Sequence, residues 1–114
     1  MIRDMEYFKG TKGKWHRSGT VVVSSDNMIE IADVWGANEL PHHEWTDAQM
    51  QEAEANAQVM AAAPDLLDAA ASAWIMLNDI PEEFMDDLNK RVVNKLNQSI
   101  SKALGYEIGK NKTL

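Results

Sequence analysis

The stretch TDAQMQEAEANAQVMAAAPDLL, which runs from Thr46 to Leu67, decides the fold of this chain. Thr46 and Gln49 have the spacing of a capping box, in which the threonine side chain accepts a hydrogen bond from the third amide of a helix and the glutamine side chain reaches back. Apolar residues then recur at helical spacing, namely Met50, Ala53, Ala57, Met60 and Ala61. We therefore expect a helix over about 47–62, with alanines small enough for another helix to approach closely.

Two further helices are expected after this stretch. Pro64 lacks an amide hydrogen and its ring clashes with the preceding turn, so it should separate the first helix from a second one over about 64–77. A break at residues 78–81 follows, with Asp79 as the expected N-cap of a third helix over about 81–104. The third helix should end at Gly105 and carries apolar residues every four positions, namely Phe84, Leu88, Val92, Leu96, Ile100 and Leu104.

The segments on either side of the helices complete the predicted fold. A β-branched run at residues 20–25 and an alternating run at 28–35 flank the turn pair Asp26-Asn27, which predicts a β-hairpin over about 20–35. Residues 1–18 should form an irregular basic arm, and residues 106–114 a tail. The pattern predicts an α+β fold, with an N-terminal β-hairpin followed by two to three antiparallel α-helices in a single domain over 19–105.

Charge is distributed unevenly along the 114 residues, whose net charge is −7. From Val21 to Asn89 there is no Lys or Arg, but there are fifteen Asp and Glu, while all the basic residues lie nearer the two ends. An acidic body repels phosphates and attracts basic surfaces. This pattern disfavours direct nucleic-acid binding, and favours either a protein partner with a basic face or simple solubility.

The sequence lacks the motifs of most catalytic and cofactor sites. It contains no Cys, which excludes disulfides, thiol catalysis and Cys-ligated zinc. The histidines, His16 and the adjacent His42 and His43 next to Glu44, have no regular metal-ligand spacing. There is no catalytic-triad pattern and no Gly-rich phosphate loop, and no apolar run reaches the roughly 18 residues of a membrane span. We therefore expect a non-enzymatic protein with no metal, no cofactor and no association with a membrane.

Two groups of side chains are candidates for binding a partner. The first is an acidic cluster that could occupy a basic groove as a run of phosphates does; its members are Asp79, Glu82, Glu83, Asp86 and Asp87. A solvated start of the third helix is the alternative. The second group is Trp35 and Trp45, which flank the polar loop and belong to a residue type enriched at interface hot spots. A role in the core is the alternative for this pair, and is the expected role of Trp15 and Trp74.

The alanine-proline part of the opening stretch resembles a box found in many small phage and prophage proteins. These proteins share the pattern E-A-N-A-x-x-x-A-A-A-P-[DE]-L-L-x-A, which residues 54–69 match. Upstream, Thr11-Lys-Gly-Lys-Trp15 occupies the place of their T-P-G-x-W start, with lysine instead of proline, and Ile31-Ala-Asp-Val34 matches their I-A-x-V segment. The resemblance covers about residues 11–78 and implies a phage origin without implying an activity. The box itself should act in packing, because small residues and a proline kink set how closely a helix is approached.

These observations predict a phage protein that binds and blocks a host protein in the host bacterial cytoplasm, with a nucleic-acid-handling, CRISPR-like complex that has a basic surface as the expected target. A second hypothesis is a sponge that sequesters a nucleotide signal between subunits, with a tryptophan stacked on the base. The basic residues that would have to meet in such an oligomer are Lys12, Lys14, Arg17, Lys90 and Arg91. A third is a self-associating accessory protein, with the third-helix stripe as its seam. We expect a homodimer, because a small core and an open hairpin edge favour association.

Overall fold

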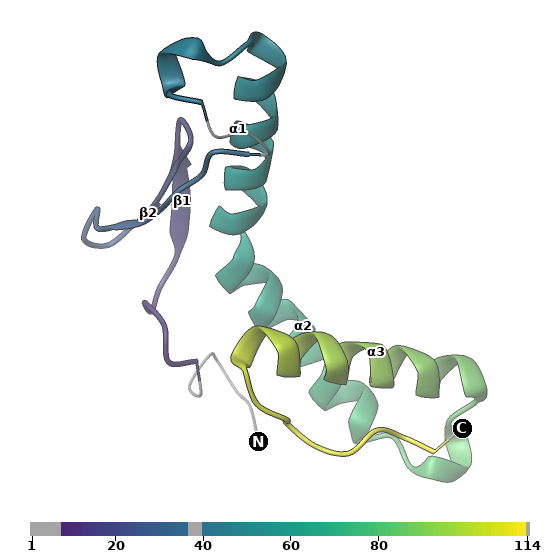
Figure 1. Ribbon diagram of the computed structural model, residues 1–114. Helices are drawn as coiled ribbons and strands as arrows, with labels where there is room; N and C mark the ends of the chain where they lie inside the picture. Colours follow the sequence, from purple (N-terminus) through teal and green to yellow (C-terminus); the bar gives the residue numbers. More distant parts are fainter. Residues whose placement is uncertain (1–7, 37–39, 114) are drawn as a thin grey trace. The chain divides into compact units, whose positions relative to one another are not determined.

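The computed structural model describes residues 8–36 and 40–113, and its fold is α+β, as predicted. Three strands precede three α-helices in the chain (Figure 1). The contacts divide the chain into two compact units, and each is described by itself. The sheet unit comprises Thr11–Asp65, and the helical unit comprises Leu66–Leu114 with the described residues before Thr11. The expected division was one domain over 19–105, so the boundary after Asp65 is a new feature.

The sheet has one more strand than the predicted hairpin. Its order is β1 (Trp15–Ser18), β2 (Val21–Ser24) and β3 (Glu30–Asp33), with both neighbouring pairs antiparallel. β1 lies within the segment expected to be an irregular arm, which corrects that prediction for residues 15–18; residues 1–7 of the arm lie outside the described residues. The link from β1 to β2 is tight because Gly19, at φ +63°, takes a left-handed conformation that suits a two-residue hairpin turn.

The connection from β2 to β3 is less regular than the first hairpin. Its strands change register between Val22 and Val23, which interrupts the regular ladder. Met28 lies in this connection at φ +56°, a left-handed conformation that is uncommon for a residue with a large side chain. β3 therefore begins at Glu30, two residues later than the expected start at Met28.

Helix α1 (Asp47–Ala61) packs against the sheet through its alanines (Figure 1). Ala53, Ala57 and Ala61 follow one another every four residues and are all buried, and Ala57 and Ala61 share a core cluster with Val22 of β2. The small side chains therefore admit a sheet rather than the second helix that we expected. Met60, expected on the same stripe, is 40% exposed.

Thr46 begins α1 with the predicted capping box, and Pro64 separates α1 from α2 as predicted. The Thr46 hydroxyl accepts from the Gln49 amide at 3.1 Å, and the Gln49 side chain accepts from the Thr46 amide at 2.9 Å. α1 ends at Ala61 and α2 (Ala63–Asn78) begins after a single residue, so Pro64 occupies the first turn of α2, where its missing amide hydrogen is tolerated.

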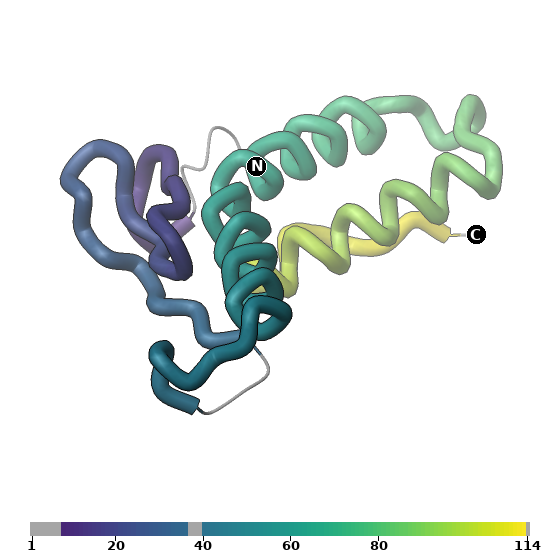
Figure 2. Tube along the Cα trace, turned by 90° about the horizontal axis from the view of Figure 1, so that it is seen from above, coloured from purple at the N-terminus to yellow at the C-terminus, as the bar shows by residue number. Residues whose placement is uncertain are grey.

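The helical unit is built on α2 and α3 (Asp87–Leu104), which lie side by side in Figure 2. Their shared core contains Ala71 and Trp74 from α2, Val93 and Ile100 from α3, and Met85 from the connection. α3 begins six residues later than expected, and its N-cap is Asp86 rather than Asp79. The cause is local, because η2 (Glu82–Phe84) is followed by its C-cap Met85, whose extended backbone interrupts the helical path.

Residues 106–113 lie along α3, although they form neither helix nor strand (Figure 2). Three polar side chains spaced along α3 hold this tail. Asn94 donates to the Lys112 carbonyl at 2.9 Å and accepts from the Lys112 amide, Asn97 donates to the Gly109 carbonyl at 3.2 Å, and Ser101 accepts from the Ile108 amide at 3.2 Å. The expected tail is therefore fixed to the helical unit by its backbone.

Candidate functional site

The connection between α2 and α3 brings the predicted acidic cluster into one turn, residues 79–87, which we call the acidic turn. Asp79 follows α2, Glu82 and Glu83 lie in η2, Asp86 caps α3 and Asp87 is its first residue. All five residues are exposed. The prediction placed Asp79 at the N-cap of the third helix and the other four residues in its first turns, whereas only Asp87 lies in α3.

Two of the five carboxylates hold the local fold. Glu82 lies 3.3 Å from the Lys90 ammonium and 3.5 Å from that of Lys112, and Asp86 accepts a hydrogen bond from the Asn89 amide at 2.7 Å. The remaining three, Asp79, Glu83 and Asp87, form no ion pair with any residue that the structure describes. The acidic turn thus presents three uncompensated negative charges.

Large apolar side chains accompany these charges at the surface. Phe84 is 72% exposed, Leu88 67% and Val92 41%, and all three belong to the four-residue apolar repeat noted in the sequence. An α-helix advances about 100° per residue, so residues four apart drift by about 40° at each step and a six-member series cannot face one side. Val93 and Ile100 face the core, and the start of the repeat turns outward.

Trp35 and Trp45 lie together in the sheet unit, joined by a histidine. Their ring centroids are 5.9 Å apart, and His42 of η1 (His42–Glu44) stacks on Trp45 at 4.0 Å and meets Trp35 edge-on at 5.5 Å. The Trp45 indole N–H donates to the Leu40 carbonyl at 2.6 Å. Trp35 is 38% exposed and Trp45 half-buried, so these rings pack on one another and still contribute to the surface.

Gly36, which follows Trp35, lets the chain pass close to α1. Gly36 has φ +70°, and a Cβ there would lie 3.2 Å from a carboxylate oxygen of Glu52 and 3.4 Å from the Ala53 amide nitrogen of α1. Only glycine combines this conformation with so close an approach to a helix. The chain therefore passes close to α1 at Gly36, directly after Trp35.

Two of the three histidines, His16 and His42, have partners other than metals. His42 lies 3.9 Å from Asp33 as well as in the aromatic group, and the His16 ring nitrogen Nδ1 lies 2.9 Å from the Ser25 hydroxyl. Within the described ranges, no group of three or more His, Cys, Asp or Glu side chains is placed to hold a metal ion. Asp33 also accepts from the Thr20 hydroxyl at 3.4 Å, which links β3 to the start of β2.

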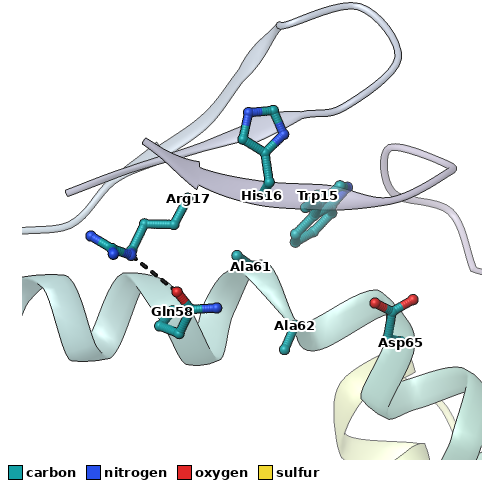
Figure 3. A pocket seen from close by; sticks show the side chains of 7 residues that line it. All are labelled: Trp15, His16, Arg17, Gln58, Ala61, Ala62 and Asp65. Carbon is teal, nitrogen blue, oxygen red and sulfur yellow. Dashed lines mark hydrogen bonds between the residues drawn. The ribbon is translucent and has the colours of Figure 1, made fainter. Parts of the chain in front are cut away.

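A pocket in the sheet unit was not predicted from the sequence. It has a volume of about 320 Å³ and lies between β1 and the end of α1 (Figure 3); its lining residues are Trp15, His16, Arg17, Gln58, Ala61, Ala62 and Asp65. The nucleotide hypothesis places Arg17 and a tryptophan at a site between subunits, whereas Trp15 and Arg17 line this pocket within one chain. Gln58 and Asp65 lie more than 40 residues away in the chain, so no local pattern could have joined them to β1.

The fold and these surfaces define a small α+β protein with an acidic, partly apolar turn. The chain belongs to a phage protein family: the family model described as Salmonella phage P22 protein Y8K6 matches residues 4–107. Comparison with curated proteins gave no match, and comparison with solved structures gave none. The phage origin implied by the alanine-proline box is therefore confirmed, while the box as the signature of that family stays a prediction.

Hydropathy along the helices adds one further finding. Within residues 8–36 and 40–113, no single helix is long and apolar enough to cross a membrane, and only α1 and α2 taken as a bent pair reach the required length and composition.

Proposed function

We propose that this phage protein is a non-enzymatic binding protein whose acidic turn docks on a basic surface of a host protein. The expected target is a nucleic-acid-handling, CRISPR-like complex in the host bacterial cytoplasm, which the protein would block as an anti-defence or host-takeover inhibitor. The observation that carries the proposal is the exposure of all five carboxylates of the acidic turn in one connection.

Charge supports a basic partner. Glu82 and Asp86 are engaged in an ion pair and a helix cap, which leaves Asp79, Glu83 and Asp87 to attract an incoming surface. A patch of one charge sign speeds association with a surface of the opposite sign, and a groove that normally holds phosphates offers such a surface.

Exposed apolar side chains next to the acidic turn favour a protein partner, because a simple counter-ion would not contact them. Phe84 and Leu88 are among the most exposed large apolar side chains of the described chain, and both lie among the carboxylates. An apolar centre surrounded by polar groups is the usual composition of a protein interface, and exposed aromatic residues often supply its strongest contacts.

The test is capture of host proteins by an N-terminally tagged protein, compared with a variant carrying Asp79→Lys, Glu83→Lys and Asp87→Lys. These positions avoid the carboxylates that hold the fold. We expect a stoichiometric partner that is released by high salt and is lost, by at least about tenfold in affinity, from the variant. Mass spectrometry of the retained proteins identifies it.

A matched control carries the same type of charge reversal away from the turn, at Glu30→Lys and Glu107→Lys. Both residues are exposed, and neither belongs to the acidic turn. The control should bind as the unmodified protein does. Retained binding by the triple variant, with its helical content unchanged by circular dichroism, would remove the acidic turn from the interface.

Trp35 and Trp45 are proposed as a second contact with the partner. Trp35, which is 38% exposed, is the more direct test, because Trp45 stacks on His42 and donates to the Leu40 carbonyl. Trp35→Ala should weaken partner binding while leaving the melting temperature within a few degrees. Unchanged affinity would assign the pair a structural role alone.

Two alternatives compete with this proposal. Sequestration of a nucleotide between subunits needs five basic residues to converge, but Lys90 is paired with Glu82 and Arg17 with Glu54. Self-association through Phe84, Leu88 and Val92 is compatible with their exposure, and a homodimer is the expected state. Sedimentation at micromolar concentration tests both alternatives at once. A monomer would exclude self-association through these residues and also a nucleotide site shared between subunits.

A further inference from the structure

The pocket between β1 and the end of α1 carries an inference independent of the acidic turn. We propose that it binds an organic cation, a guanidinium or ammonium group on a short alkyl chain. Its volume of about 320 Å³ is at the small end of ligand sites, which suits one such group. All its lining residues belong to the sheet unit, so the site is complete within that unit.

Arg17 is already neutralised inside the pocket. Its Nη1 lies 3.0 Å from a Glu54 carboxylate oxygen and 2.9 Å from the Gly19 carbonyl, and its Nε donates to the Gln58 side-chain oxygen at 3.0 Å (Figure 3). These bonds fix the guanidinium against α1 and offset its charge. An anionic ligand would have to compete with Glu54 for this group.

Asp65 is the charged lining residue that lacks an ion-pair partner among the residues the structure describes. It is exposed, lies in the first turn of α2 and borders the end of the pocket away from Arg17 (Figure 3). The surrounding unit has three Lys and Arg against nine Asp and Glu, a net charge of −6. Both the local and the unit-wide charge therefore favour a positive ligand over a phosphate.

Trp15 supplies an aromatic wall held in one orientation. Its indole N–H donates to the Thr11 carbonyl at 3.2 Å, and the ring packs beside the cluster of Val22, Ala57 and Ala61. Indole is the aromatic ring that attracts cations most strongly, and a guanidinium group can both stack on a ring and bind a carboxylate. The small side chains of Ala61 and Ala62 leave the space between Trp15 and Asp65 unfilled.

The test is titration of the full chain with ethylguanidinium, followed by the ¹⁵N–¹H NMR signals of the Trp15 indole and the Gln58 side chain. We expect saturable shifts with a dissociation constant of the order of millimolar, as befits so small a ligand. Ethylurea, which has the same shape without the charge, should bind at least about tenfold more weakly. Equal binding of the two probes, or no saturable shift at these signals, would overturn the proposal.

Asp65→Asn removes the unpaired charge and should weaken ethylguanidinium binding by about tenfold. Asp47→Asn is the matched control, because Asp47 is likewise an exposed first-turn carboxylate, at the start of α1 and outside the pocket. It should leave binding unchanged. An equal effect of both variants would show attraction by net charge alone and would contradict a built site.

The cation has two natural sources, and two further probes separate them. A capped Gly-Arg-Gly peptide represents an arginine side chain of a protein, and putrescine represents a free polyamine. Tighter binding of the peptide than of putrescine assigns the pocket to a protein partner, and the reverse assigns it to a small metabolite. Binding of neither probe would contradict the proposal.

Discussion

The chain leads into α1 and α3 by the same backbone path, forty residues apart. Pro41 and Pro81 each have an extended conformation and precede a three-residue 3₁₀ turn, one extended residue, an N-cap and an aspartate that begins the helix. In both segments the amide of the third residue after the proline donates to the proline carbonyl at 2.9 Å. We call these segments the first connector, residues 41–46, and the second connector, residues 81–86.

The two connectors differ in the side chain that occupies the extended position before the cap. In the first connector Trp45 is half-buried and stacks on His42 of its own 3₁₀ turn. In the second connector Met85 is 7% exposed and belongs to the core of the helical unit. The first connector therefore packs on its own side chains, Trp45 and His42. The second connector is instead anchored by Met85 in the core of the helical unit, and it leaves Phe84 exposed.

The largest expected difference between the connectors is the cost of truncating this side chain. Met85→Ala should lower the free energy of unfolding by about 2–5 kcal/mol, because it opens a cavity among buried neighbours. Trp45→Ala should cost less, since the ring is already partly in solvent. Urea denaturation followed by circular dichroism measures both, and a larger loss for Trp45→Ala would show that the first connector is anchored as firmly as the second.

Removal of a helix cap should lower the free energy of unfolding by less than truncation of Met85 does. The two caps differ, because Thr46 and Gln49 exchange two hydrogen bonds, whereas Asp86 and Asn89 share one. Thr46→Ala and Asp86→Ala should each cost about 1 kcal/mol, because each removes the acceptor for a helix amide. Gln49→Ala should also destabilise the first connector, whereas Asn89→Ala should leave the second cap intact, since Asn89 contributes only its backbone amide. Thermal unfolding of the four variants checks this order, and equal effects of Gln49→Ala and Asn89→Ala would contradict it.

The smallest effect concerns the glutamates of the two 3₁₀ turns. Glu82→Gln should cost less than about 1 kcal/mol, because the Glu82 side chain is 53% exposed and solvent screens its ion pairs, and the loss should shrink in high salt. Glu44→Gln is the matched control, because Glu44 forms no ion pair with the described residues. Denaturation at low and high salt measures both, and a salt-independent loss at Glu82 would point to packing instead of charge.

The two connectors also show which local features, here helix caps, can be predicted from the sequence and which cannot. The first cap was predicted because both members of its box, Thr46 and Gln49, are visible in the sequence. The second was missed because the Asn89 side chain does not reach back to the cap, and because Asp79 stands two residues before Pro81, near which a helix often starts. Strand β1 was missed because Trp15–Ser18 contains no β-branched residue, so its pairing with the valines of β2 supplies the preference that the segment lacks.

The candidate sites follow the same division between local and distant information. The acidic turn is contiguous, so its charges and exposure were predictable from the sequence. The outward position of Phe84 and Leu88 was not, because it depends on where α3 begins and on the drift of a four-residue repeat. The pocket joins Arg17 to Gln58 across 41 residues, a contact that only the packing of α1 on β1 creates.

The attachment of the tail to α3 fixes where anything added to the end of the chain would emerge. Lys112 is bound by Asn94 and lies 3.5 Å from Glu82 in the acidic turn. A fluorophore at Thr113 would therefore sit beside that turn and report its occupancy directly. A bulky C-terminal fusion would instead obstruct it, which is why the capture experiment above carries its tag at the other end.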